Sequence, residues 1–126
     1  MPYKILIVDD EPLAAQALAR MCALLDHQPI IANNAGVAVR HLRQNPPDLV
    51  FLDMDMPQFS GIDLCNYIKH DPRLKAIPVV FVSANDQDQA MWEGMKAGAA
   101  DYLVKPLDFD RLEAVLDKLL GTSERR

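Results

Sequence analysis

The sequence predicts a three-layer α/β/α domain whose central sheet holds five parallel strands in the order 2-1-3-4-5. Short apolar runs rich in β-branched residues alternate with longer segments in which apolar residues recur every three or four positions. The apolar runs show little polar alternation, which is typical of strands that are covered on both faces. Strictly alternating strands and helices favour a parallel sheet with right-handed crossovers.

The order of elements follows from these runs and from the residues that interrupt them. Pro12 suits the first turn of the first helix, and Pro46 cannot continue the second. The turn at Ser60 and Gly61 precedes the third helix, and Gly121 is expected to cap the last one. The strands are expected at 4–8, 29–32, 48–52, 78–82 and 101–104, and the helices at 12–25, 35–44, 62–70, 87–97 and 108–120.

Two helices have clear apolar periodicity. In the first, the apolar residues at helical spacing include Leu13 and Leu24. The last helix is expected to direct one apolar face inward, which consists of Leu112, Val115, Leu116, Leu119 and Leu120.

Length, charge and hydropathy exclude several classes of protein. The 126 residues suit one domain, and half of them are hydrophobic. A net charge of -5 argues against a nucleic-acid surface, which needs clustered Lys and Arg. The longest apolar runs are far shorter than the roughly 20 residues that span a bilayer. Because a strand begins within a few residues of the N-terminus, no signal peptide is expected, and we predict a cytoplasmic location.

The cysteines and histidines suggest no metal site. Cys22 and Cys65 lie in helical segments without the histidine spacing of a zinc site, so we expect reduced residues in or near the core. The histidines His27, His41 and His70 share no spacing and are expected to be exposed.

Polar residues follow four of the five apolar runs. Asp9 and Asp10 follow the first, Asp53 the third, Ser83 the fourth and Lys105 the fifth. Because the carboxyl ends of parallel strands meet at one edge of the sheet, these side chains should converge on one cleft. Three carboxylates, a hydroxyl and an amine suit a site that holds a divalent cation beside a carboxylate that accepts a phosphoryl group.

The sequence motifs around these residues support the same interpretation. In order, they read Ile-Val-Asp-Asp-Glu-Pro (7–12), Leu-Asp-Met-Asp-Met-Pro (52–57), Val-Ser-Ala (82–84) and Gly-Ala-Ala-Asp-Tyr-Leu-Val-Lys-Pro (98–106). Together they resemble the response-regulator receiver domain, over 4–120. The resemblance implies a flavodoxin-like fold and a bacterial two-component system, with the receiver domain at 1–121. The polar segment 122–126 is either a tail or the start of a linker.

The resemblance assigns the phosphoacceptor and a Mg²⁺ site. Asp53 is the implied phosphoacceptor, taking the phosphoryl group from a phosphohistidine. Mg²⁺, which prefers octahedral oxygen ligation, is assigned to the carboxylates of Asp10 and Asp53 and to the backbone carbonyl of Asp55. Asp9 is assigned to the metal through water. The three carboxylates should repel one another without the metal and raise at least one pKa.

The remaining site residues are also assigned by resemblance. Lys105 would pair with the acyl phosphate, and Ser83 would donate a hydrogen bond to a phosphoryl oxygen. The Lys105–Pro106 peptide bond is implied to be cis. Tyr102 has two open interpretations: a switch aromatic that turns inward when Ser83 engages phosphate, or an ordinary strand residue. Asp55 stands at a position that varies in the family. Its charge is expected to repel or steer the water that attacks the phosphorylated site.

Simpler structural roles compete with these assignments. Asp9 or Asp10 would suit a cap on the first helix, and Asp53 would suit the end of a strand. Ser83 could be a turn hydroxyl and Lys105 a solvated charge. These roles would require four independent coincidences at one edge of the sheet.

The resemblance implies partners but no separate substrate. The chain would catalyse only its own phosphorylation and dephosphorylation, with a sensor histidine kinase or phosphotransfer protein as donor. Phosphorylation would reshape the face formed by the fourth helix, fifth strand and fifth helix, for a downstream protein target or a fused output domain. A phosphorylation-linked homodimer is also open, although Val115 stands where one subfamily has an interface arginine. Trp92, in the fourth helix, suits either the core or an interaction surface.

Two other functions compete with this one. A phosphorylation-silent receiver would act as a constitutive binding module. An aspartate-nucleophile phosphatase of the haloacid-dehalogenase type would use the pair Asp53 and Asp55. That family places its paired-acid strand first, whereas here the pair Asp9 and Asp10 comes first.

Overall fold

The computed structural model describes residues 2–57 and 59–121. Strands and helices alternate along them as the sequence predicts, with every boundary within one residue of the expected position. The strands are β1 (Lys4–Val8), β2 (Gln28–Ala32), β3 (Leu49–Asp53), β4 (Val79–Ser83) and β5 (Asp101–Val104). The helices are α1 (Pro12–Leu24), α2 (Ala35–Gln44), α3 (Gly61–His70), α4 (Asp88–Lys96) and α5 (Phe109–Leu120). The polar segment 122–126 lies outside the described residues.

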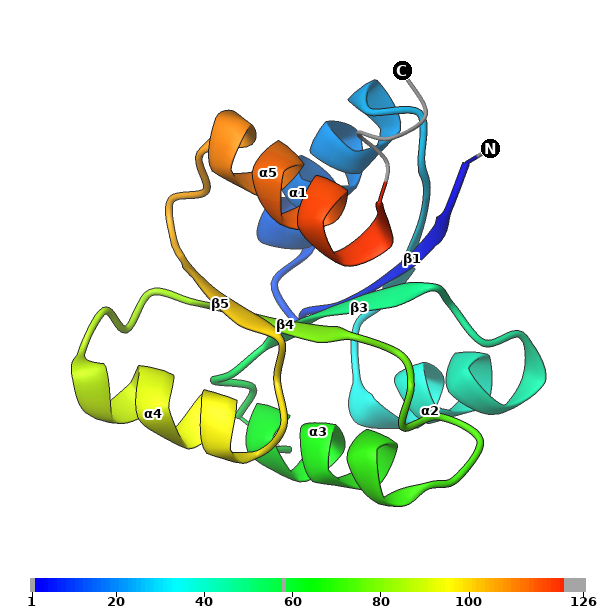
Figure 1. The fold of residues 1–126 in the computed structure, drawn as a ribbon, viewed down its shortest axis with the longest axis vertical. Coiled ribbons are helices and arrows are strands. Elements are labelled where there is room, and N and C mark those ends of the chain that lie inside the picture. The colour runs from blue at the N-terminus through cyan, green and yellow to red at the C-terminus, as the bar shows by residue number, and fades with distance from the viewer. Residues whose placement is uncertain (1, 58, 122–126) are drawn as a thin grey trace.

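The strands form one parallel sheet in the order β2-β1-β3-β4-β5, which confirms the predicted topology. In Figure 1 the sheet is the middle layer, with α1 and α5 on one face and α2, α3 and α4 on the other. The register sets Val8 beside Leu52, and Ser83 beside Val104. The carboxyl ends of β1, β3, β4 and β5 therefore lie along one edge.

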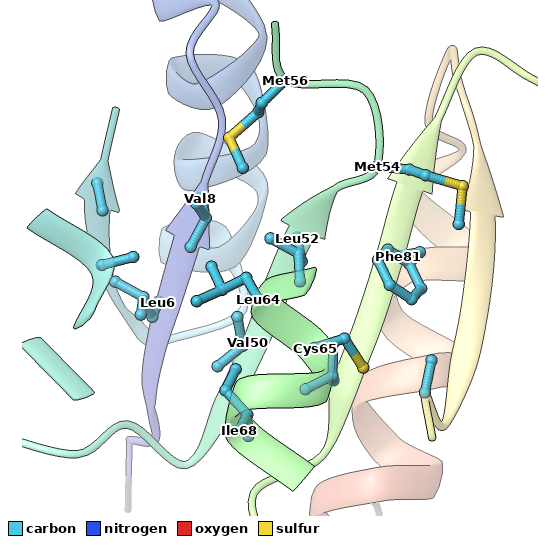
Figure 2. Packing of buried hydrophobic residues seen from close by; sticks show 14 of the residues in the cluster. Leu6, Val8, Val50, Leu52, Met54, Met56, Leu64, Cys65, Ile68 and Phe81 are labelled. Carbon is cyan, nitrogen blue, oxygen red and sulfur yellow. The ribbon is translucent and has the colours of Figure 1, made fainter. Parts of the chain in front are cut away.

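Each face of the sheet has its own hydrophobic core, because successive side chains of a strand point to opposite faces. On β1, Ile5 packs in the core under α1 and α5, whereas Leu6 packs in the core under α2, α3 and α4. Figure 2 shows the second core, where Leu64 and Ile68 of α3 face Val50 of β3. Two filled cores hold the sheet edge, and the site on it, in place.

The ends of the helices follow the local sequence. The side chains of Asn34, Ser60 and Asp108 accept hydrogen bonds from backbone N–H groups at the starts of α2, α3 and α5. Gly121 ends α5 in the left-handed region, with φ 68°, as predicted for a glycine cap. Within the described residues, none of the helices is both long and apolar enough to cross a membrane.

Burial differs from the sequence-based expectation at a few positions. Leu13 and Leu24 on α1 are largely exposed, since the buried face of that helix is centred on Ala15, Leu18 and Cys22. His27 was expected to be exposed, and that is wrong: it is buried, and its Nδ1 accepts a hydrogen bond from the Tyr3 backbone N–H. Cys22 and Cys65 are free and buried, and burial raises the pKa of both thiols.

Candidate functional site

The polar residues singled out in the sequence lie at one edge of the sheet. Asp53 and Ser83 are the last residues of β3 and β4, and Lys105 directly follows β5. Asp9 and Asp10 directly follow β1. Five residues spread over most of the chain are thus positioned by the ends of four parallel strands.

The three carboxylates form a compact cluster. Asp9, Asp10 and Asp53 can each contribute an oxygen such that these atoms all lie within 4.8 Å of one another. Asp9 and Asp53 are buried, whereas Asp10 is exposed. Neither Asp9 nor Asp10 is the N-cap of α1: Glu11 holds that position, and its side chain makes no capping hydrogen bond. The helix-cap interpretation of the two acids is therefore wrong.

Asp53 has a perturbed acidity. Burial raises its pKa to about 6, and the Asp9 carboxylate acts in the same direction. The Asp55 backbone N–H, which donates to Asp53 Oδ1 at 3.1 Å, and the Lys105 ammonium both oppose the rise. Repulsion between the carboxylates, which predicts a raised pKa, does contribute, but burial is the larger cause.

Lys105 approaches the acidic cluster from the carboxyl end of β5, at the same edge of the sheet. Its ammonium lies 3.4 Å from Asp9 Oδ2, and Asp9 Oδ1 accepts the Glu11 backbone N–H at 2.9 Å. The peptide bond between Lys105 and Pro106 is cis. The Lys105 side chain is about one-quarter exposed, so it is open to an anionic group that enters the site from solvent.

Ser83 has a partner that sequence reasoning missed. Its Oγ donates a hydrogen bond to Asp55 Oδ2 at 2.8 Å and accepts one from the Asn85 backbone N–H at 3.0 Å. The roles predicted for Asp55 involve its backbone carbonyl and its charge near the attacking water, and not a side-chain bond to Ser83. The side-chain bond crosses from the loop after β3 to the end of β4, and no spacing in the sequence indicates it.

Tyr102 lies inside the molecule. Its side chain is buried, its hydroxyl donates to the Asn85 carbonyl oxygen at 2.8 Å, and Met54 Sδ lies 3.8 Å from the same hydroxyl. Its ring is tilted against that of Phe81, with centroids 6.4 Å apart. Tyr102 therefore contacts the loops after both β3 and β4.

Gly61 is a second residue whose importance at the site the sequence did not reveal. A Cβ atom at Gly61 would lie 2.5 Å from the carbonyl oxygen of Asp53 and 2.8 Å from the Cα of Met54. The Gly61 N–H donates to the Met54 carbonyl oxygen at 3.2 Å. Only glycine allows the start of α3 to approach the end of β3 this closely. The sequence marks Gly61 as a turn residue but does not show what it approaches.

The donor set fits a hard divalent cation. Clustered carboxylate oxygens are the ligands that Mg²⁺ prefers, and a cation would offset the cost of burying Asp9 and Asp53 near each other. A groove of about 410 Å³ opens beside Asp10, between Asn33 and Asn34 on one side and Pro57 and Phe59 on the other. Of the three clustered carboxylates, Asp10 lines this groove, which opens to solvent.

Comparison with known proteins gives a consistent result. The chain matches the family model of the response regulator receiver domain over residues 5–117. It is 37% identical over 118 residues to protein PilH of Pseudomonas aeruginosa, covering 94% of this chain and 98% of that protein. It is 35% identical over 103 residues to the transcriptional regulatory protein BaeR of Escherichia coli, covering 82% of this chain but 42% of BaeR.

Solved structures agree with this match. The receiver domain of a signal transduction histidine kinase from Syntrophus aciditrophicus superposes with a TM-score of 0.86 at 31% identity, covering 98% of this chain and 94% of that one. A two-component response regulator from Clostridium difficile gives a TM-score of 0.87 at 28% identity, with 94% and 96% coverage. Sequence, fold and site geometry lead to one conclusion: this chain belongs to the response regulator receiver family of two-component signalling.

Proposed function

We propose that this receiver domain accepts a phosphoryl group on Asp53 from a phosphohistidine of a sensor histidine kinase or phosphotransfer protein. The observation that carries the proposal is the placement of a buried carboxylate at a strand end, with two further carboxylates beside it. The Lys105 ammonium, paired with Asp9, adds a cation at the same edge. The groove beside Asp10 leaves room for the donor's imidazole to approach.

The reaction exchanges one bond to phosphorus for another. An Asp53 carboxylate oxygen attacks the phosphorus in line, a P–O bond forms, and the P–N bond to the donor imidazole breaks. The imidazole leaves with the bonding electrons and takes up a proton. Lys105 pairs with the negative charge of the acyl phosphate, and Ser83 donates to one phosphoryl oxygen. Hydrolysis of the acyl phosphate by water returns Asp53 to its free form.

Mg²⁺ would be held by Asp10, Asp53 and the backbone carbonyl of Asp55, with Asp9 acting through water. When bound, the cation supplies neutralisation of phosphoryl charge. The protein's own contribution is to hold Asp53 in line and to keep its carboxylate ionised at neutral pH despite burial.

The phosphorylated state would be read through the face formed by α4, β5 and α5. Ser83 and Lys105 would both move toward the phosphoryl group, pulling on the loops that lead to this face. The reader is a downstream protein, a second copy of the chain, or an output domain fused to it. Relatives such as BaeR extend well beyond the matched region, which supports the fused arrangement for some members of the family.

Intact-mass spectrometry after incubation with acetyl phosphate and Mg²⁺ tests the proposal. We expect the wild-type protein to gain one phosphoryl group, Asp53→Asn to gain none, and both to gain none when Mg²⁺ is chelated. The matched control is Asp63→Asn, which removes an exposed acid at the start of α3 and should leave the gain intact. A wild-type protein that binds Mg²⁺ but gains nothing would favour the phosphorylation-silent alternative.

Turnover of a generic phosphomonoester separates this function from a phosphatase. We expect the wild-type protein to hydrolyse the phosphomonoester no faster than the Asp53→Asn variant does. Sustained multiple turnover that requires Asp53 would favour the phosphatase alternative, which family membership argues against.

A further inference from the structure

The carboxylate of Asp55 accepts the hydrogen bond that Ser83 would otherwise be free to donate to a phosphoryl oxygen. The Ser83 hydroxyl carries one proton, and that proton is donated to Asp55 Oδ2 at 2.8 Å. Ser83 is only 1% exposed, so water cannot easily replace this partner. For Ser83 to donate to a phosphoryl group on Asp53, its bond to Asp55 must first break.

The same bond is connected to Tyr102 through the loop after β4. Ser83 Oγ accepts the Asn85 backbone N–H at 3.0 Å, and the Asn85 carbonyl oxygen accepts the Tyr102 hydroxyl at 2.8 Å. The loop is therefore held at two points, one on each side of the Asn85 peptide. Tyr102 is buried in this arrangement.

A carboxylate is well suited to accept the hydrogen bond of Ser83 in place of a phosphoryl oxygen. An ionised acceptor makes a shorter and stronger hydrogen bond to a hydroxyl than a neutral one. A buried hydroxyl that loses its acceptor also carries a desolvation cost. Asp55 thus resembles a phosphoryl oxygen in charge and in hydrogen-bonding capacity.

We propose that Asp55 is a positioning residue for Ser83: its carboxylate substitutes internally for a phosphoryl oxygen and holds Ser83, the loop 83–85 and Tyr102 inward before phosphorylation. The receiver would then be partly preset toward the inward arrangement. Phosphorylation would change the partner of Ser83 more than it changes the position of Tyr102. The effect of phosphorylation on the partner of Ser83 rests on the proposed function. The preset inward arrangement concerns the unphosphorylated protein alone.

Fluorine NMR of protein labelled with 3-fluorotyrosine tests the proposal directly. The chain contains three tyrosines, and Tyr102→Phe identifies the resonance of Tyr102. In metal-free, unphosphorylated wild type we expect Tyr102 to give a single resonance that is insensitive to exchange of H₂O for D₂O. In Asp55→Ala we expect a second, solvent-sensitive Tyr102 resonance from side chains turned outward. The ratio of outward to inward Tyr102 should rise roughly tenfold or more, as for loss of a charged hydrogen bond.

Two comparisons separate positioning from a general loss of structure. Asp86→Ala removes an exposed acid from the same loop and should leave the Tyr102 resonance unchanged. In a Ser83→Ala background, Asp55→Ala should have no further effect on the resonance, because Asp55 acts through the hydroxyl. Ser83→Thr, which keeps a hydroxyl, should restore the response to Asp55→Ala. If Asp55→Ala does not fold, Asp55→Asn should give a smaller change in the same direction.

Several results would overturn the proposal. A Tyr102 resonance that is the same in Asp55→Ala and wild type would do so, and so would an equal effect of Asp55→Ala with and without the Ser83 hydroxyl. A second arm adds acetyl phosphate and Mg²⁺: the wild-type resonance should shift little, and in Asp55→Ala the solvent-sensitive resonance should be lost. Absence of phosphorylation in both proteins would count against the proposed function and leave the result of the first arm standing.

Discussion

At the scale of single residues, Asp53 combines two properties that oppose each other. A nucleophilic carboxylate must be ionised, but burial and the neighbouring Asp9 raise its pKa to about 6. The folded protein therefore binds a proton at Asp53 more tightly than the unfolded chain does, where the pKa is near 3.8. Burying the Asp53 carboxylate near Asp9 therefore costs stability once Asp53 is ionised.

Stability should reflect this cost in a pH-dependent way. As pH rises from about 4 to about 6, the unfolded chain loses its proton at this position first, so folding stability falls, and the loss remains at higher pH. Asp53→Asn removes the penalty. At pH near 7.5 without metal, we expect this variant to unfold several degrees higher than wild type, a gain of at most about 3 kcal/mol. Near pH 3.5 the gain should vanish.

Thermal unfolding in chelator at both pH values is the measurement. Asp86→Asn, at an exposed position, serves as the control and should change little. The account of Asp53 would be wrong if Asp53→Asn were equally stable or less stable than wild type near pH 7.5.

Asp10 should matter for the metal and not for the fold. It is exposed, so Asp10→Asn should change the metal-free free energy of unfolding by less than about 0.5 kcal/mol. Wild type should be stabilised as Mg²⁺ is raised, by mass action, and Asp10→Asn should need at least tenfold more Mg²⁺ for the same rise in Tm. A variant that responds to Mg²⁺ like wild type would remove Asp10 from the proposed ligands.

At the scale of elements, the sequence predicted most of what positions the site. The apolar runs and the prolines and glycines between them located every strand and helix within one residue, and polar residues after these runs located the sheet edge. These features are local, so a single sequence carries them. The hydrogen bond from Ser83 to Asp55 and the burial of His27 depend on which side chains meet across elements. Local sequence patterns do not contain that information.

The close approach of α3 to β3 gives a test at this scale. Gly61→Ala would place a methyl group 2.5 Å from the Asp53 carbonyl oxygen, which is backbone and cannot rotate away. We expect a loss of about 1 to 3 kcal/mol in the free energy of unfolding, together with weaker Mg²⁺ binding because the end of β3 must shift.

Gly36→Ala is the matched control, since a Cβ there would meet only Asn34 Oδ1 at 3.4 Å. It lies in α2, where alanine is the better helix former, so we expect no loss or a small gain in stability. Denaturant unfolding of both variants is the measurement. Equal stabilities would show that the end of β3 yields easily and that Gly61 does not fix it.

At the scale of the whole molecule, a hydrophobic core packs on each face of the sheet, and the candidate site residues lie at the strand ends along one edge. The chain spans 98% of PilH but 42% of BaeR, so one receiver architecture occurs both nearly alone and within longer regulators. In either setting we propose that the edge that holds Asp53 reports its state through the face of α4, β5 and α5.

The central claim is that Asp53, among several neighbouring carboxylates, carries the phosphoryl group. Borohydride reduces an acyl phosphate to an alcohol and so converts a phosphorylated aspartate to homoserine, which peptide sequencing by mass spectrometry can locate. After acetyl phosphate and Mg²⁺, we predict homoserine at position 53 and aspartate unchanged at positions 9, 10 and 55. Homoserine at any of those three positions, with Asp53 intact, would contradict the account.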